Sequence, residues 1–219
     1  IFLDVETTGL DRANDEVIEI GAIKYRNGVR LDEFNRLIAP AKPLPDEIRT
    51  ITGITDEELA QKGVDRKQAF TDFLKFIDEP NALICGYNVE FDRAFLAAEL
   101  KRNLNLEWSQ PCEDVMAVAV SSLPGLSSRR LTSVAAELGV ELKEAHRAMA
   151  DTQATADIFY LLLQRQDIEQ QIFYERLVPL AALAAVADMM PLTGENRSIV
   201  AEGLRILRES PPLGLRTLL

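Results

Sequence analysis

The sequence has few of the residues on which zinc and disulfide chemistry depend. Two cysteines and one histidine occur among 219 residues. Cys85 and Cys112 have dissimilar neighbours and no metal-ligand spacing, which argues against a disulfide framework and a cysteine-based zinc site. Two packed thiols in a reducing compartment are the simplest interpretation, so we expect a cytoplasmic protein.

Long hydrophobic runs are also missing. The longest, residues 178–192, is interrupted by Asp188 and is shorter than the roughly 18 apolar residues that a membrane-spanning helix needs. The sequence begins at Ile1, within a strand-like segment, without an initiator methionine or a basic, apolar signal segment. We therefore expect no membrane association, and a chain that is truncated at its start.

Positive charge is scarce. Lys and Arg number 24 against 35 Asp and Glu, which gives a net charge of -11 and a pI near 4.7. Non-specific duplex binding depends on many Lys and Arg contacts with phosphate, so the composition argues against broad adhesion to DNA. That argument weakens where acidic groups surround divalent cations, because the cations then dominate the local field.

The remaining composition is that of a globular protein, with 47% hydrophobic and 27% charged residues. The length suits one domain of roughly 100–200 residues with a short appendage. We expect a domain at residues 1–166 and a helical appendage at residues 167–219. Within this appendage, one helical stripe can comprise Ile168, Ile172, Leu180, Leu183 and Val186.

Three strands are predicted at the start of the chain. Residues 1–6 alternate with period two, and a turn follows them. Residues 17–25 and 29–38 are rich in Val, Ile and Phe, and Asn27-Gly28 between them is a strong hairpin signal.

Helical spacing dominates the chain after Pro45: first at Ile48 and Ile51, then in a short acidic helix that Thr55 can cap, and then in residues 70–77 with Phe70, Phe73, Leu74 and Ile77 on one face. Residues 82–85 form a short apolar run ended by Gly86, which predicts a buried strand between helices. Further helical spacing covers residues 91–100, 115–120, 131–138 and 147–163. Three antiparallel strands followed by this alternation predict an α/β fold with a mixed sheet covered by helices.

The first candidate motif is the pair Asp4 and Glu6. Two residues apart on a strand, their side chains project from one face while Leu3 and Val5 pack on the other. Like charges about 4 Å apart repel by roughly 4 kcal/mol at an effective dielectric near 20, so a partly buried pair needs protons or cations. Taken alone, an exposed polar face of an edge strand is the simpler interpretation.

The second motif is Asn88 with Asp92. Asn88 can cap a helix beginning near Val89, and Asp92 in its first turn suits the helix dipole. Phe91 and Phe95 lie one turn apart and can form a core stripe. Taken singly, capping and packing explain all four residues.

The third motif is His146, the sole histidine, followed by Asp151. Asp151 shares a helix face with Ala154, Ile158 and Leu162, which directs its carboxylate inward and requires a partner. Taken alone, His146 would be a residue at the start of the helix, bonded to backbone.

Together the three motifs resemble those of the DnaQ-like exonucleases, the DEDD family with histidine. Residues 1–10, IFLDVETTGL, look like its first motif, residues 86–92, GYNVEFD, its second, and residues 146–152, HRAMADT, its third. The resemblance covers about residues 1–166. It implies a ribonuclease H-like fold, in which three antiparallel strands are followed by parallel additions.

The resemblance also implies an active site. Two divalent cations, Mg²⁺ or Mn²⁺, would be held by Asp4, Glu6, Asp92 and Asp151, with Asp4 shared between them. Oxygen ligands suit these hard ions, and a pair of ions can stabilise the attacking and leaving oxygens of an in-line displacement.

The remaining roles concern the proton and the substrate. We expect His146 to act as general base, since its unperturbed pKa near 6.5 suits neutral pH. By family likeness, Thr7 and Leu10 would contact the terminal nucleotide, with Phe91 near it. From the sequence alone, the same three residues belong to a turn and the core.

The tail carries a second resemblance. Residues 180–219, especially Asp188 within ADMMPL, Asn196-Arg197 and Gly214-Leu215-Arg216, resemble a segment of RecJ-type single-strand exonucleases. Asp188 holds the place of a metal-ligand aspartate there. That family also needs an Asp-His-His motif, which one histidine cannot supply. The tail is therefore either part of a longer fusion chain concerned with DNA repair or a helical packing segment with Asp188 as a solvated charge.

Three functions stay open on the sequence. The first is a 3′→5′ exonuclease that acts on the 3′ end of single-stranded DNA, with a DNA polymerase or repair proteins as partners. The second is an enzyme of the same family that trims RNA ends or oligoribonucleotides. The third is an interaction module without catalysis, against which the intact ligand set argues.

Overall fold

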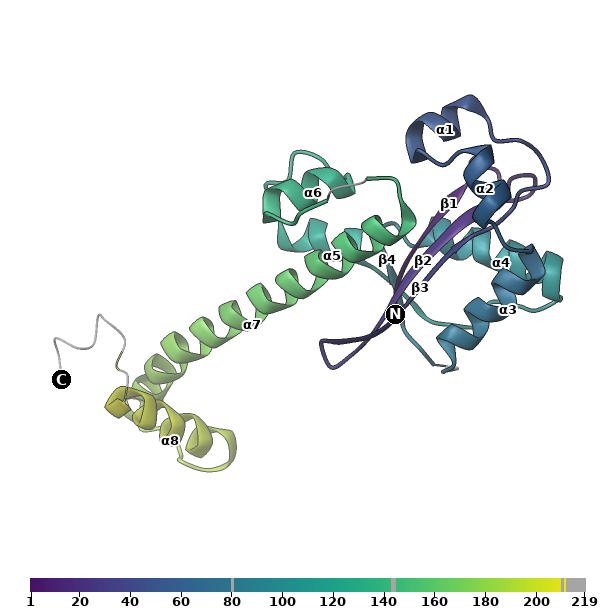
Figure 1. Ribbon diagram of the computed structural model, residues 1–219. Coiled ribbons are helices and arrows are strands. Elements are labelled where there is room, and N and C mark those ends of the chain that lie inside the picture. The colour runs from purple at the N-terminus through teal and green to yellow at the C-terminus, as the bar shows by residue number, and fades with distance from the viewer. Residues whose placement is uncertain (80, 143–144, 210, 212–219) are drawn as a thin grey trace. The chain divides into compact units, whose positions relative to one another are not determined.

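The chain folds as two compact units, Ile1–Leu162 and Leu163–Leu219. The computed structural model describes residues 1–79, 81–142, 145–209 and 211. In the first unit, a central sheet has helices on both of its faces (Figure 1). No helix in the described part of the chain is both long and apolar enough to cross a membrane.

The sheet has five strands in the order β3-β2-β1-β4-β5. Strands β1, β2 and β3 pair in antiparallel fashion, whereas β4 is parallel to β1 and β5 is parallel to β4. The predicted mixed sheet is thus confirmed, and β1 lies at its centre instead of at an edge. The strands are β1 Phe2–Thr7, β2 Val17–Arg26, β3 Val29–Leu37, β4 Ile84–Gly86 and β5 Cys112–Asp114.

The hairpin between β2 and β3 forms at the predicted turn. Asn27 and Gly28 both have positive φ, 52° and 78°, as the tight turn between twisted antiparallel strands requires. The sequence prediction missed β5, because three residues are too few to display a period of two.

The helices follow the predicted spacing with small shifts at their ends. Thr55 caps α2 by accepting a hydrogen bond from the Glu58 N–H at 3.1 Å, as predicted. The helices are α1 Asp46–Thr52, α2 Asp56–Lys62, α3 Arg66–Ile77, α4 Glu90–Leu104, α5 Val115–Ser122, α6 Leu131–Leu138, α7 Ala148–Ala187 and α8 Gly194–Glu209.

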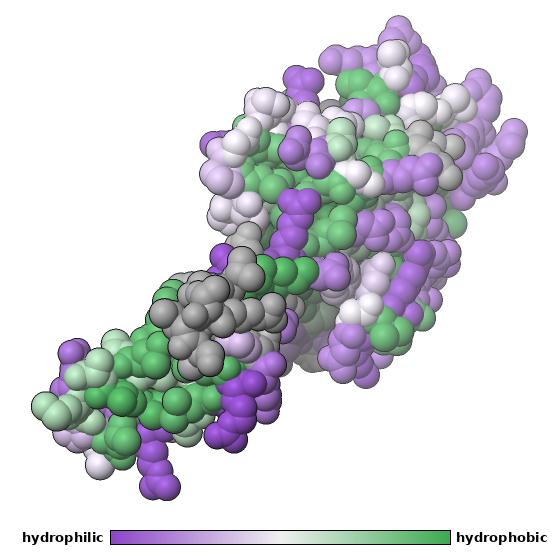
Figure 2. Space-filling view, turned by 90° about the vertical axis from the view of Figure 1, so that its left-hand side faces the viewer, coloured by the Kyte–Doolittle hydropathy of each residue, from purple (hydrophilic) through white to green (hydrophobic). Residues whose placement is uncertain are grey.

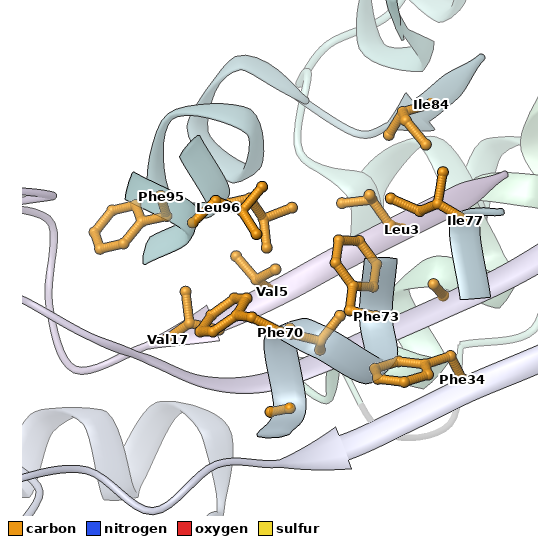
Figure 3. Close-up of a cluster of buried hydrophobic side chains, with 14 of the residues drawn as sticks. Leu3, Val5, Val17, Phe34, Phe70, Phe73, Ile77, Ile84, Phe95 and Leu96 are labelled. Carbon is orange, nitrogen blue, oxygen red and sulfur yellow. The ribbon is translucent and has the colours of Figure 1, made fainter. Parts of the chain in front are cut away.

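The two faces of the sheet have separate hydrophobic cores. Leu3 and Val5 of β1 pack with side chains of α3 and α4, including Phe73 and Leu96 (Figure 3). Phe2, on the opposite face, packs with residues of α5, α6 and α7. Alternation along β1 therefore places its even-numbered residues on the face that α7 covers.

Helix α7 is longer than predicted. The sequence suggested a helix at residues 147–163 and a separate helical stripe further on, but one helix runs through both and contains Pro179. Residues 163–178 contain neither glycine nor proline, so nothing breaks the helix before that point. Asp188 lies just beyond its end and is exposed, which agrees with the interpretation of a solvated charge.

The second unit contains the later turns of α7 together with α8. Close approach of the two helices is possible at Gly203, where an added Cβ would lie 2.3 Å from the Ala182 Cβ. Apolar side chains remain exposed on this unit, which Figure 2 shows in green. They include Leu177, Leu180, Leu183, Val186 and Met189.

A buried ion pair supports the face of the sheet under α3 and α4. The Glu99 side chain is 1% exposed, and it accepts hydrogen bonds from Arg66 Nη1 at 2.8 Å and from the Val17 N–H at 3.2 Å. Asn103 Nδ2 donates to its other oxygen at 2.7 Å. A buried carboxylate with this many donors ties α3 and α4 to the start of β2.

We predict that Glu99→Gln lowers the free energy of unfolding by about 3 kcal/mol, because removing one charge of a buried pair leaves the other poorly compensated. Urea denaturation measures the change. The matched control is Glu107→Gln, which removes the exposed partner of Lys101 and should cost no more than about 1 kcal/mol. Equal effects of the two variants would contradict the importance of the buried pair.

Candidate active site

Strand β1 presents two carboxylates on the face covered by α7. Asp4 and Glu6 are half-buried, whereas Leu3 and Val5 between and beside them are buried in the opposite core. Because β1 is the central strand, this is not the exposed edge that either residue alone would suggest.

Asp92, in the first turn of α4, reaches the same strand. Its side chain is buried, and its Oδ1 accepts a hydrogen bond from the Val5 N–H at 2.9 Å. The predicted capping by Asn88 is wrong: Val89 is the N-cap, without a side-chain cap bond. Asn88 instead has a φ of 62°, and its N–H donates to Asp114 Oδ1 at 2.9 Å. The start of α4 is therefore held by β5, the strand that the sequence did not reveal.

Asp151 lies on the inward face of α7, as its spacing with Ala154, Ile158 and Leu162 predicted. Its Oδ2 accepts a hydrogen bond from the His146 N–H at 3.1 Å. Its Oδ1 is buried and has no hydrogen-bond partner among the described residues. A buried carboxylate oxygen without a donor is costly, and it is what a metal ligand looks like in the absence of its ion.

His146 precedes this helix in a left-handed backbone conformation, with a φ of 66°. Its side chain is exposed, whereas its backbone is fixed by the bond to Asp151. One ligand atom each of Glu6, His146 and Asp151 lies within 4.8 Å of the others. The structure therefore brings a possible metal-binding group together from β1, the loop before α7 and α7 itself.

The four predicted carboxylates act on one another. Burial raises the pKa of Asp4 well above its usual range, and the charge of Asp92 adds most to that effect, followed by Glu6 and Asp151. Burial likewise raises the pKa of Glu6 to about 8, with Asp151 as its strongest acidic neighbour. The pKa of Asp92 rises through burial to about 7 despite the bond from Val5, and burial raises that of Asp151. A site of this kind favours protons or cations.

The residues predicted to contact substrate differ in exposure. Thr7 is buried, and its hydroxyl donates to the Gly9 carbonyl at 2.6 Å within the turn after β1. Leu10 is 86% exposed in the loop that follows. Phe91 is half-buried and contacts Phe95, with ring centroids 4.8 Å apart. Only Leu10 is thus freely available to another molecule.

The loop that carries Leu10 is braced by its own side chains. Asp15 accepts hydrogen bonds from the Thr8 hydroxyl at 3.1 Å and from the Asp11 N–H at 2.9 Å. The Thr8 N–H donates to the Glu16 carbonyl at 2.8 Å. An exposed leucine is therefore held on an ordered support beside β1.

The sequence analysis missed Glu19 and Arg147. Glu19 of β2 is fully buried, and both its carboxylate oxygens accept hydrogen bonds from Arg147 at 3.1 Å. A signal was present, since Glu19 interrupts an otherwise apolar strand between Ile18 and Ile20. Charged residues are rarely buried without a partner, so a buried Glu19 requires an oppositely charged or hydrogen-bonding partner.

Comparison with known proteins agrees with this arrangement. The RNase_T exonuclease family matches residues 1–159. The PolC-type DNA polymerase III of Thermotoga maritima is 39% identical over 208 residues, which cover 95% of this chain and 15% of that protein. Its Bacillus subtilis counterpart is 34% identical over 165 residues, 75% of this chain and 11% of that protein. The chain thus spans a small part of these relatives.

Among solved structures, E. coli Exonuclease I in complex with a dT13 oligonucleotide has a TM-score of 0.68 and 26% identity. The match covers 80% of this chain and 43% of that one. It confirms the predicted ribonuclease H-like fold.

Of the two family resemblances noted in the sequence, the comparisons support only one. These comparisons give no support to the RecJ resemblance of residues 180–219, part of which, Gly214-Leu215-Arg216, lies outside the described residues. The T. maritima match instead extends past Leu163, since it covers 95% of the chain. The DnaQ-like resemblance is confirmed, and the chain belongs to the RNase_T exonuclease family.

Proposed function

We propose that residues 1–166 are the catalytic domain of a metal-dependent 3′→5′ exonuclease that releases nucleoside monophosphates from single-stranded or frayed DNA ends. The observation that carries this proposal is the convergence of four carboxylates: Asp4 and Glu6 share one face of β1, Asp92 binds the Val5 N–H of the same strand, and Asp151 has a ligand atom within 4.8 Å of one of Glu6. Burial raises the pKa of each. Such a cluster is costly to the fold, and bound cations would offset that cost.

The donor set fits divalent cations. Four carboxylates offer the hard oxygen ligands that Mg²⁺ and Mn²⁺ prefer. The Oδ1 of Asp151, for which the described part of the chain supplies no hydrogen-bond donor, is available as one of them. We assign Asp4, Glu6, Asp92 and Asp151 as ligands of two ions, with Asp4 shared. When bound, two such ions would stabilise the attacking and leaving oxygens of phosphodiester hydrolysis.

We assign His146 as the general base. Its exposed side chain lies beside Glu6 and Asp151, while the hydrogen bond from its N–H fixes its backbone. An exposed imidazole at the edge of the carboxylate site can take a proton from an attacking water and release it to solvent. The same proximity would let His146 act as a ligand, and the two roles differ in whether loss of the imidazole raises the Mn²⁺ requirement.

The terminal nucleotide would rest against residues next to β1. Leu10 presents an apolar side chain on a braced loop and would contact the terminal base. Thr7, whose hydroxyl is engaged in the turn, would contribute through its backbone and by fixing that loop. Phe91, stacked on Phe95, would form the wall near this base.

The substrate and partners follow from the relatives. The Exonuclease I structure contains a dT13 oligonucleotide, which supports a single-stranded DNA 3′ end as substrate. The PolC-type relatives are DNA polymerases, which supports a role beside a polymerase, in proofreading or repair. The acidic net charge suits an enzyme that grips a strand end at its metal site more than one that coats a duplex.

The deciding experiment uses single-stranded DNA and RNA of one sequence, labelled at either end, with Mg²⁺, Mn²⁺ or EDTA. We expect mononucleotides to be released from the 3′ end of DNA only when metal is present. Asp4→Asn should reduce release to background, because it removes the shared ligand, whereas Asp32→Asn, an exposed carboxylate of β3, should not. Digestion of RNA alone would favour the RNA-trimming alternative, and metal binding without product would favour an interaction module.

We predict that His146→Ala lowers kcat by roughly 10²–10⁴-fold, the usual contribution of a positioned general base. The Mn²⁺ concentration for half-maximal activity should stay near the wild-type value. Single-turnover kinetics across a Mn²⁺ series measure both quantities. Wild-type turnover would remove the base assignment, and a large rise in the Mn²⁺ requirement would identify His146 as a ligand.

The metal-free protein should lose stability as pH rises. The pKa of Glu6 is raised from 4.5 to about 8 by folding, so the folded protein binds this proton more tightly than the unfolded chain does. The stability that protonated Glu6 contributes is fully present below about pH 4.5 and is lost as the pH rises through 8. In EDTA, the melting temperature of Glu6→Gln minus that of wild type should therefore increase as the pH is raised from 6 to 9.

Added Mn²⁺ provides the complementary measurement. It should raise the wild-type melting temperature more at pH 9 than at pH 6, because the ligands must be deprotonated to bind. A difference between Glu6→Gln and wild type that does not change with pH would argue against the raised pKa.

A further inference from the structure

The first turn of α7 is anchored to β2 by an ion pair that the proposed chemistry does not use. Arg147 donates from Nε and Nη2 to the two carboxylate oxygens of Glu19, each at 3.1 Å. The Ala148 N–H, at the start of α7, donates to Glu19 Oε2 at 3.2 Å. One buried carboxylate therefore binds a side chain and a backbone group of the segment that leads into α7.

A close backbone approach reinforces this anchor two residues further along β2. A Cβ added to Gly21 would lie 2.5 Å from the Ala148 carbonyl carbon and from the Met149 nitrogen. The Thr152 hydroxyl donates to the Gly21 carbonyl at 3.0 Å. Only a residue without a side chain lets the helix lie this close to the strand.

The register of the sheet connects this anchor to the carboxylate site. Glu19 lies directly opposite Glu6, and Gly21 directly opposite Asp4. The two β2 residues that hold α7 are thus the pairing partners of the two β1 carboxylates. Since α7 carries Asp151, this arrangement sets where Asp151 lies relative to Asp4 and Glu6.

Glu19 is itself a carboxylate next to the cluster, but its contacts separate it from the ligands. Both its oxygens are engaged by Arg147, and its side chain is 1% exposed. Its charge raises the pKa of Glu6, whereas the charge of Arg147 lowers it. The guanidinium, whose planar fork matches a carboxylate, thus partly offsets the acidic cluster from a fixed position.

We propose that Glu19 and Arg147 are a positioning pair that seats the first turn of α7 on β2, so that Asp151 and His146 face Asp4 and Glu6 before any cation binds. The inference rests on the proposed metal site and adds residues that do not touch metal or substrate. The pair acts as the partners behind metal ligands do, by fixing where the ligands lie.

The test has two measurements on the full chain. Calorimetric titration with MnCl₂ alone gives the Mn²⁺ affinity, and an activity series gives the Mn²⁺ concentration that nucleotide release requires. We expect Glu19→Gln to weaken Mn²⁺ binding by about 10–100-fold, the usual effect of changing a partner behind a metal ligand. Nucleotide release should need correspondingly more Mn²⁺. Arg147→Lys keeps the positive charge but loses the two-pronged geometry, so it should shift both quantities in the same direction and serves where Glu19→Gln does not fold.

Asp56→Asn is the matched control, because Asp56 also accepts a backbone hydrogen bond, from the Leu44 N–H at 2.8 Å, and pairs with an arginine, Arg49. Its helix α2 and the helix of Arg49, α1, carry no proposed ligand. Asp56→Asn should destabilise the fold while leaving the Mn²⁺ affinity at the wild-type value. Wild-type Mn²⁺ affinity in Glu19→Gln or Arg147→Lys, with a lowered melting temperature, would reduce the pair to a purely structural role and overturn the proposal.

The outcomes also separate this inference from the proposed function. A wild-type protein that binds Mn²⁺ but releases no nucleotide would refute the exonuclease proposal, and the Mn²⁺ affinities of the variants would still test the pair. A wild-type protein that binds no Mn²⁺ would overturn both.

Discussion

Repulsion among four carboxylates is the main constraint on the first unit, and the rest of its structure compensates for it. Asp4, Glu6, Asp92 and Asp151 come from one strand and two helices, and burial makes their shared charge costly. No isolated strand or helix would keep such groups together, because each would turn its charge toward water. The fold must therefore fix the backbones that carry them.

The two carboxylates on helices, Asp92 and Asp151, are held by backbone hydrogen bonds that do not neutralise them. The Val5 N–H fixes Asp92 against β1, and the His146 N–H fixes one oxygen of Asp151. Backbone donors favour the charged form without supplying a full opposite charge, so the site stays acidic. The closed core under α3 and α4 provides stability on the other face of the same strand, where Leu3 and Val5 alternate with the acids.

Local patterns allowed much of the fold and the site to be predicted. Period-two alternation identified β1, Asn27-Gly28 identified the hairpin, and helical spacing placed Asp151 on an inward face. Those signals are written in neighbouring residues. The family motifs then joined the three segments, which spacing alone could not have done, since each motif has an adequate explanation as a cap, a turn or a packed face.

What the sequence did not reveal depends on contacts between distant segments. β5 is three residues long, and its Asp114 fixes the Asn88 backbone, so the cap expected of Asn88 is replaced by a bond across the sheet edge. The Glu19–Arg147 pair joins residues 128 apart in sequence. A lone glutamate in an apolar strand indicates that it has a partner, but the sequence does not show which residue that partner is, because the two meet only in the folded chain.

The carboxylates that α4 and α7 contribute to the site differ in how well they are compensated. Asp92 is buried, and its Oδ1 already has a backbone donor. Asp151 has one bonded oxygen and one buried oxygen that lacks a donor among the described residues. Because an unsatisfied buried acceptor costs more than a satisfied one, α7 would gain most from a cation at the proposed metal site and would most need an independent anchor. The ion pair between Glu19 of β2 and Arg147 lies at the start of this helix, where we propose that it serves as that anchor.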